Sequence, residues 1–197
     1  MSIPLRHKKA LIIGLNYTNK GLWTLKGAQN DARATRSLLQ DTYMFAEHEM
    51  VVMSDYEGIE NSLLPTRSNI IHQLNTFVME KNEDTDYVFI YAGHTDQFPD
   101  TGPSMHQEED GKAECIVPLD AISPDADIPD KTKVIFDFEL HEYMIKRLGL
   151  GCRLTAIADS CHSATLLNVI VLSVTPQPLM EPDMLFVDLY VTPWKSQ

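Results

Sequence analysis

Short apolar runs alternate along this chain with segments whose apolar residues recur at helical spacing, and this alternation strongly limits the possible folds. The runs at 10–15, 50–53, 87–91 and 154–158 are too short for helices and are typical of buried strands. Helical spacing occurs over 26–39, after Pro65 as far as 78, and over 137–148. Because strands that alternate with helices pair in parallel through right-handed crossovers, we expect an α/β fold with a mostly parallel sheet flanked by helices.

Length and composition indicate one globular domain. The chain has 197 residues, of which 44% are hydrophobic and 22% charged, and this composition excludes disordered and collagen-like chains. The length suits a single domain, and no internal repeat or interdomain linker divides it. We therefore expect residues 1–197 to form one domain.

Charge and cysteine content restrict the partners and the compartment. The 28 acidic residues exceed the 16 basic ones, and the resulting net charge of −12 repels phosphate backbones and anionic lipids. Three cysteines without close spacing make no disulfide framework, and residues 1–9 lack the apolar core of a signal peptide. We expect a cytoplasmic protein that binds neither nucleic acid nor membranes, and the sequence leaves its oligomeric state open.

Two strand ends carry residues suited to nucleophilic catalysis. His94 follows the run at 87–91, and Cys161 follows the run at 154–158. Ligands of open α/β sheets bind beyond the carboxyl ends of strands, and a cysteine needs a base within hydrogen-bond reach to act as a nucleophile. Polar neighbours distinguish Cys161 from Cys115 and Cys152, which we expect to be small buried residues. His162 is a weaker alternative base.

The stretch 95–132 is rich in Asp, Glu, Pro and Gly, with one brief apolar interruption at 115–119. We expect a long loop that is either a solvated acidic surface or a functional segment. Its aspartates lack the spacing of an EF-hand, and Gly14–Gly21 lacks the spacing of a phosphate-binding loop. Nucleotide binding is therefore not expected.

Two sequence blocks resemble the catalytic blocks of metacaspases, the caspase-like cysteine peptidases of fungi, plants and protists. They are YAGH at Tyr91–His94 and DSCHS at Asp159–Ser163. Supporting blocks occur in the order of the family: KKALIIGLNY at 8–17, LKGAQNDA at 25–32, LLPTRSNI at 63–70, CIVPLDA at 115–121 and LHEYM at 140–144. The resemblance covers residues 8 to 166.

The resemblance implies a caspase-like (caspase/haemoglobinase) fold and a cysteine endopeptidase that cleaves after Arg or Lys. In this reading Cys161 is the nucleophile, His94 is the general base, and acyl transfer passes through a thioester. Backbone N–H groups at Cys161 and beside His94 would form the oxyanion hole. The carboxylates that receive the P1 side chain match Asp31 and Asp159. The alternative for Asp31 is a plain surface residue on a helix.

Many metacaspases need calcium, and here the resemblance is incomplete. Asp110 (or Glu109) and Asp137 match ligand positions, but Phe138 and Asn168 stand where carboxylates are expected. Phenylalanine offers a hard cation no oxygen ligand, so we expect calcium binding to be weak or absent and no cofactor to be required. The sequence also has Thr95 and Ala164 where the family usually has glycine, which a catalytic loop can need for positive φ.

The residues after Cys161 depart furthest from the family. Only 162–197 remain, and they do not resemble the small-subunit half of a metacaspase. Val169–Val174 and Met184–Val191 are strand-like, and we expect them to pair with the exposed sheet edge, unless the tail is an artefact of the gene model. Two further functions stay open: a catalytically inactive homologue that binds partners, and a thiol redox sensor based on Cys161.

Overall fold

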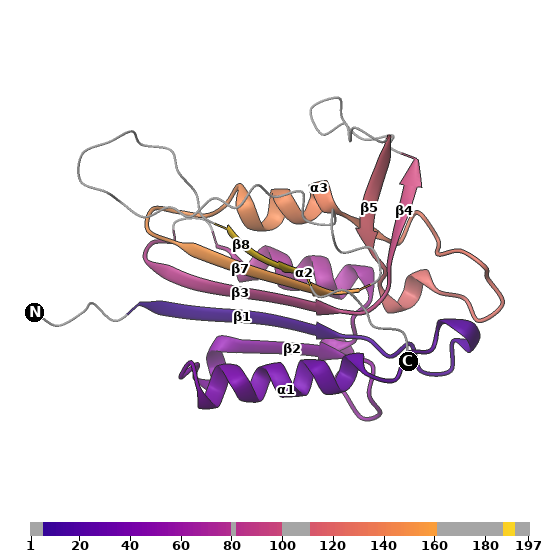
Figure 1. Ribbon diagram of the computed structural model, residues 1–197, viewed down its shortest axis with the longest axis horizontal. Helices are drawn as coiled ribbons and strands as arrows, with labels where there is room; N and C mark the ends of the chain where they lie inside the picture. The colour runs from indigo at the N-terminus through magenta and orange to yellow at the C-terminus, as the bar shows by residue number, and fades with distance from the viewer. Residues whose placement is uncertain (1–5, 80–81, 100–110, 161–186, 192–197) are drawn as a thin grey trace, which may run out of the picture.

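The computed structural model describes residues 6–79, 82–99, 111–160 and 187–191 (Figure 1). Its main sheet has five strands in the order β2-β1-β3-β7-β8, and every neighbouring pair is parallel. The strands are β1 (His7–Gly14), β2 (Met50–Ser54), β3 (Thr85–Ala92), β7 (Arg153–Asp159) and β8 (Val187–Val191). The α/β fold with a parallel sheet is therefore confirmed.

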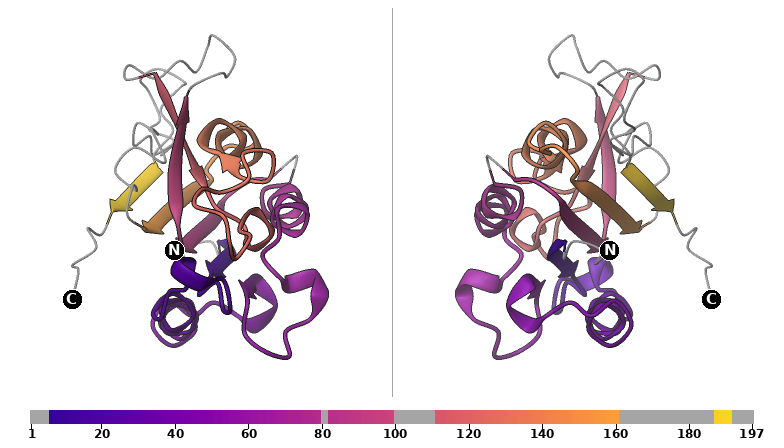
Figure 2. Two further views of the ribbon diagram at one scale, coloured as in Figure 1. Left: turned by 90° about the vertical axis from the view of Figure 1, so that its right-hand side faces the viewer. Right: turned by 90° about the vertical axis from the view of Figure 1, so that its left-hand side faces the viewer.

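Helices cover both faces of this sheet, with α1 on one side and α2 and α3 on the other (Figure 2). They are α1 (Ala28–Asp41), α2 (Arg67–Phe77) and the short α3 (Asp137–Leu140), which continues as a π-turn over His141–Ile145. Alternate residues of β1 supply the two cores: Leu11 and Ile13 face α2 and α3, whereas Ala10 and Ile12 pack with the buried residues of α1. Short 3₁₀ turns lie at Gly21–Trp23, Glu47–Glu49, Asn61–Leu63 and Leu119–Ala121.

Helical spacing predicted α2 well and the segment at 137–148 less well. Thr66 caps α2, because its side chain accepts a hydrogen bond from the backbone N–H of Asn69 at 3.3 Å. After α3 the hydrogen bonding changes to the π pattern and ends at Ile145, so the regular helix is shorter than expected.

The expectation of a long loop over 95–132 is wrong at two strands and agrees with the structure at 117–132, apart from one 3₁₀ turn. This stretch contains β4 (Thr95–Pro99) and β5 (Lys112–Ile116), which with β6 (Ile135–Phe136) form a second, antiparallel sheet. Its strands carry polar residues that pair across the sheet, as Gln97 does by donating to Glu114 at 2.9 Å. In β5 apolar residues are also buried, namely Ala113, Cys115 and Ile116, but the run is too short and too mixed to indicate a strand.

The C-terminal run at 184–191 contains β8, which pairs with β7 at the edge of the main sheet. The expected edge pairing is therefore present for this part of the tail, whereas Val169–Val174 lies outside the described residues. Among the described helices, none has the length and apolarity that a bilayer span requires.

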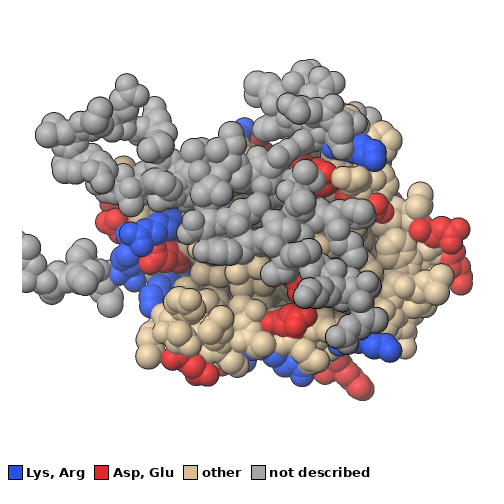
Figure 3. Space-filling model, viewed as in Figure 1, with Lys and Arg blue, Asp and Glu red and all other residues tan. Residues whose placement is uncertain are grey.

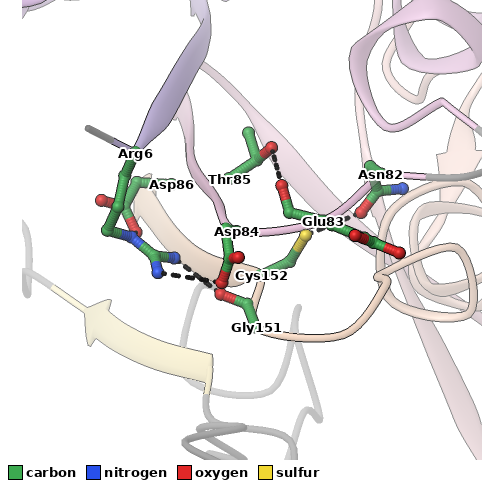
Figure 4. A network of polar contacts seen from close by, with 8 residues as sticks. All are labelled: Arg6, Asn82, Glu83, Asp84, Thr85, Asp86, Gly151 and Cys152. Atoms are coloured by element: carbon green, nitrogen blue, oxygen red, sulfur yellow. Dashed lines mark hydrogen bonds and ion pairs between the residues drawn. The ribbon is translucent and has the colours of Figure 1, made fainter. Parts of the chain in front are cut away.

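A polar network joins the starts of β1, β3 and β7 (Figure 4). Arg6 donates to Asp86 Oδ1 at 2.8 Å and to the carbonyl oxygen of Gly151 at 2.7 Å. Cys152 donates through Sγ to Asn82 Oδ1 at 2.8 Å. Cys152 is a buried free thiol, as is Cys115 in β5, so the prediction that both are small buried residues is confirmed.

The two ends of the sheet differ in charge on the face drawn in Figure 3. The largest group of Lys and Arg on this face lies at the left, where the strands begin, and acidic side chains lie at the right, towards which the strands point. Some Lys and Arg also lie at the right of this face, so acidic and basic side chains are mixed there.

Candidate active site

The residues expected at the strand ends lie at one edge of the main sheet. Ala92 at the end of β3 is in register with Asp159 at the end of β7, and His94 follows two residues after Ala92. The backbone N–H of Gly93 donates to the carbonyl oxygen of Asp159 at 3.4 Å, which holds the two strand ends together. Cys161 lies outside the described residues, which reach Ser160 immediately before it.

The imidazole of His94 is fixed by a backbone carbonyl. Its Nε2 lies 2.7 Å from the carbonyl oxygen of Trp23, in the 3₁₀ turn between β1 and α1. Because a carbonyl only accepts hydrogen bonds, Nε2 carries the proton, and in the neutral ring Nδ1 is the basic nitrogen. The ring also lies 4.8 Å from the ring of Tyr17 and 5.3 Å from the ring of Trp23, which meets it edge-on.

Burial lowers the pKa of His94 below its ordinary value. The Trp23 carbonyl and the charge of Asp96 act in the opposite direction but do not outweigh burial. The imidazole is therefore neutral at neutral pH, the state in which a histidine can accept a proton as a general base.

Asp31 and Asp159 lie beside His94. Asp31 is in the first turn of α1, and the two carboxylates are close enough for Asp159 to affect the titration of Asp31. Partial burial, and to a smaller extent the charge of Asp159, raise the pKa of Asp31. A small pocket of about 40 Å³ joins these groups, and it is lined by Leu25, Ala28, Asp31, Ala92, Gly93, His94, Asp159 and Ser160. Asp31 is an exposed residue of α1 that also lines this pocket.

A second and larger hollow, of about 490 Å³, lies on another side of His94. Its lining residues are Leu22, Trp23, His94, Pro124, Asp125, Ala126 and Asp127. The indole Nε1 of Trp23 donates to the carbonyl oxygen of Ala126 at 2.8 Å, which ties the turn after β1 to this segment. His94 therefore stands between a carboxylate pocket and a wider hollow.

One expected oxyanion donor is already engaged. Two N–H groups beside the imidazole, those of Gly93 and His94, donate to the Asp159 carbonyl and to the hydroxyl of Tyr17, respectively. These two groups are therefore engaged within the protein in this state, and the N–H of Cys161 lies outside the described residues.

The expected calcium ligands are only partly within the described residues. Asp137 begins α3, and its Oδ1 accepts from the backbone N–H of Phe138 at 2.7 Å. The ring of Phe138 stacks on Phe136 with centroids 5.4 Å apart, so this position packs as an aromatic residue. Asp110 and Glu109 lie outside the described residues, as do His162, Ala164 and Asn168. In the described part of the chain, no three His, Cys, Asp or Glu residues are grouped to hold a metal ion.

Thr95, which replaces an expected glycine, has a backbone that any residue adopts. It begins β4 and pairs with Ile116 of β5. Extended backbone does not require glycine, so Thr95 does not distort the loop that carries His94.

Sequence reasoning missed Trp23 and Tyr17 as residues of the site. Tyr17 lies inside a block that resembles the family, but nothing in the sequence assigns its hydroxyl a contact with His94. The contact of Trp23 uses a backbone carbonyl, which any residue type supplies. Neither contact has a sequence signal of its own.

Comparisons with known proteins identify the family of this chain. Residues 8–170 match the family model described as metacaspase, peptidase C14 domain. Metacaspase-1 of Schizosaccharomyces pombe is 36% identical over 178 residues, which is 90% of this chain and 39% of that protein. Metacaspase-1A of Aspergillus niger is 35% identical over 178 residues, again 90% of this chain and 41% of that protein. The chain thus spans about two fifths of the length of these curated relatives.

A solved structure supports the fold. The crystal structure of a Geobacter sulfurreducens protein, a structural genomics target, has a TM-score of 0.54 and 22% sequence identity. The similarity covers 82% of this chain and 53% of that one.

Proposed function

Because this chain belongs to the metacaspase family of peptidase C14 domains, we propose that it hydrolyses peptide bonds after Arg or Lys. Cys161 is the nucleophile in this proposal, and His94 is the general base. One observation carries it: the imidazole of His94 lines the same pocket as the carboxylates of Asp31 and Asp159.

The proposed reaction uses His94 twice. The Trp23 carbonyl holds the Nε2–H, so Nδ1 takes the proton of the Cys161 thiol while sulfur attacks the carbonyl carbon of the scissile bond. The tetrahedral intermediate collapses when Nδ1–H protonates the leaving amine, and a thioester remains. A water molecule then attacks the thioester and gives its proton to Nδ1, and the cysteine leaves as the thiol.

The two carboxylates account for the proposed choice of substrate. A guanidinium or ammonium group pairs with Asp31 and Asp159 and offsets both the burial and, to a smaller extent, the repulsion that raise the pKa of Asp31. A neutral P1 side chain would leave both carboxylates partly desolvated and without a cation. Sites built around charged partners reject such analogues strongly.

The test measures hydrolysis by the full chain of three peptides that differ only in P1: arginine, its neutral isostere citrulline, and aspartate. We expect cleavage after arginine, and Cys161→Ala and His94→Ala should each remove nearly all of it. The double variant should lose little more, because residues that act as one unit are strongly non-additive. His72→Ala, on the exposed side of α2, is the matched control.

Other outcomes identify the alternatives. Full activity in either single variant, or comparable cleavage after aspartate, would overturn the assignment. A wild-type chain that cleaves none of the peptides would favour the partner-binding homologue. A Cys161 that oxidises readily, with a His94→Ala variant that behaves like wild type, would favour the redox sensor.

We also propose that calcium has little effect. Phe138 packs against Phe136 and offers no oxygen at its expected ligand position. Activity should therefore change by less than about tenfold when millimolar calcium is added. Stronger activation would show that other oxygens form the site.

A further inference from the structure

Two buried tyrosine hydroxyls lie directly beneath the loop that carries His94. Tyr17 follows β1 and Tyr91 is near the end of β3, and both side chains are fully buried. Their hydroxyl oxygens are 3.0 Å apart. The proposed reaction gives neither residue a role.

Together the hydroxyls bind both polar groups of the His94 backbone. Tyr17 Oη accepts from the backbone N–H of His94 at 3.1 Å, and Tyr91 Oη donates to the carbonyl oxygen of His94 at 2.6 Å. On the other side, Tyr17 Oη donates to the carbonyl oxygen of Val117 at 2.6 Å, and Tyr91 Oη accepts from the N–H of Val117 at 3.2 Å. Each hydroxyl thus donates to one carbonyl and accepts from one amide, and the pair joins His94 to the residue after β5.

The surrounding backbone is adapted to this pair. A Cβ atom on Gly93 would lie 2.8 Å from Tyr91 Oη and 3.1 Å from Tyr17 Oη. Only glycine at position 93 therefore leaves room for the two hydroxyls. Tyr17 itself has a φ of +52°, which is uncommon for a residue with a side chain and persists only where the surroundings enforce it.

We propose that the hydroxyl pair of Tyr17 and Tyr91 is a positioning device for His94. It fixes the backbone of that residue so that the imidazole stays between the Trp23 carbonyl and the carboxylate pocket. Neither tyrosine touches reacting atoms, so both are positioning residues. The catalytic part of this inference rests on the proposed peptidase function.

Two further observations support it. Burial raises the pKa of both tyrosines, so both hydroxyls are protonated at neutral pH and can donate there. The ring of Tyr17 also lies 4.8 Å from the imidazole, so this residue supports both the backbone and the side chain of His94.

The experiment uses Tyr17→Phe and Tyr91→Phe in the full chain, with Tyr87→Phe as the matched control. Tyr87 is buried in the same strand as Tyr91 but near the strand's opposite end, so it reports the loss of a hydroxyl far from His94. We expect kcat on the arginine peptide to fall about ten- to a hundredfold in the first two variants, with KM changed less than about twofold, because small misplacements of a catalytic group have effects of this size. The control should keep its kcat.

A second readout needs no activity. NMR titration of the His94 ring, assigned by comparison with His94→Gln, gives its pKa and the protonated nitrogen. In Tyr17→Phe and Tyr91→Phe the pKa of His94 should rise towards its ordinary value, because a loosened imidazole becomes more hydrated. Tyr87→Phe should leave it unchanged.

The readouts separate the two proposals. If the wild type does not cleave peptides but the tyrosine variants alter the His94 titration, the peptidase proposal fails and the positioning of His94 stands. If His94 titrates as in the wild type and kcat is unchanged in both variants, the positioning role is wrong whatever the melting temperatures. If the only effect of Tyr17→Phe and Tyr91→Phe is a fall in melting temperature equal to that of Tyr87→Phe, the positioning role is also wrong.

Discussion

At the scale of single residues, the protonation state of His94 decides the pH dependence of the proposed reaction. Burial lowers its pKa, so the neutral form persists to a lower pH than for a histidine in water, whose pKa is about 6.5. A general base is lost as the pH falls through its own pKa. We therefore expect the acid limb of kcat/KM for the arginine peptide to lie below pH ~6.5.

A pH profile of kcat/KM at constant ionic strength checks this. The acidic groups around the imidazole include Asp96 in β4, whose charge favours the protonated ring, and Asp31 and Asp159 across the pocket. An acid limb above the ordinary value would mean that these charges outweigh burial, contrary to the prediction.

The carboxylates of the pocket should control selectivity more than turnover of neutral substrates. Asp31→Asn or Asp159→Asn should reduce the preference for arginine over citrulline by about tenfold or more, because an ionic hydrogen bond becomes a neutral one. The measurement is the ratio of kcat/KM for the two peptides. Asp41→Asn, at the other end of α1, should leave the ratio unchanged. If the ratio for Asp31→Asn and Asp159→Asn equals that for Asp41→Asn, these carboxylates do not bind the P1 side chain.

At the scale of elements, one arginine connects α2 with the segment that leads into α3. Arg67 pairs with Glu139 at 2.6 Å and donates to the carbonyl oxygen of Val134 at 2.6 Å, and both charged side chains are partly buried. Glu139 also accepts from the backbone N–H of Phe136 at 3.0 Å. Removal of the arginine therefore leaves several buried acceptors without their partner.

We expect Arg67→Ala to lower the free energy of unfolding by about 2 kcal/mol, as measured by urea denaturation. Arg36→Ala is the control, because Arg36 pairs with Glu47 at 2.7 Å on the exposed surface. It should cost less than about 1 kcal/mol. Equal effects would mean that the contacts of Arg67 are as well screened by water as those of Arg36.

The elements differ in how far sequence could predict them. Strand β1 has a continuous buried run, whereas buried and partly buried residues alternate in β7 and in the first half of β3; the apolar runs still marked all three strands clearly. Strands β4 and β5 were missed because each has only five residues and polar side chains interrupt its apolar ones, although Ala113, Cys115 and Ile116 of β5 are buried. The regular helix after residue 136 was predicted too long, since spacing alone does not distinguish an α-turn from a π-turn.

The same reasoning applies to the site. The rule that parallel strands end at one edge predicted that His94 and Cys161 lie across one crevice. The structure shows that β3 and β7 are adjacent, whereas Cys161 lies outside the described residues. The Trp23 carbonyl and the Tyr17 hydroxyl could not be predicted, because both reach His94 through turns whose direction depends on tertiary packing.

At the scale of the whole molecule, the edge of the main sheet beside β7 is covered by β8. A sheet edge left bare presents unpaired N–H and C=O groups to other chains. Deletion of residues 169–197 should therefore lower the melting temperature and promote aggregation, as followed by thermal melting and light scattering. Deletion of 192–197 alone keeps β8 and is the control.

Two results would contradict this expectation. Equal melting and equal solubility of the full chain and the longer deletion would show that β8 does not protect the edge. A full chain that already aggregates as readily as the deletion would favour the view that the tail has no selected role.

The edge-on contact between Trp23 and His94, with ring centroids 5.3 Å apart, gives the protein an optical signal of its own. A protonated imidazole quenches the fluorescence of a neighbouring indole, whereas a neutral one quenches it much less. The chain has two tryptophans, so a Trp194→Phe variant leaves an emission that comes from Trp23 alone. That emission should weaken as the pH falls, with a midpoint equal to the acid limb of kcat/KM, and His94→Gln should abolish the transition. The charge state of His94 then becomes visible in the resting protein, without substrate or label.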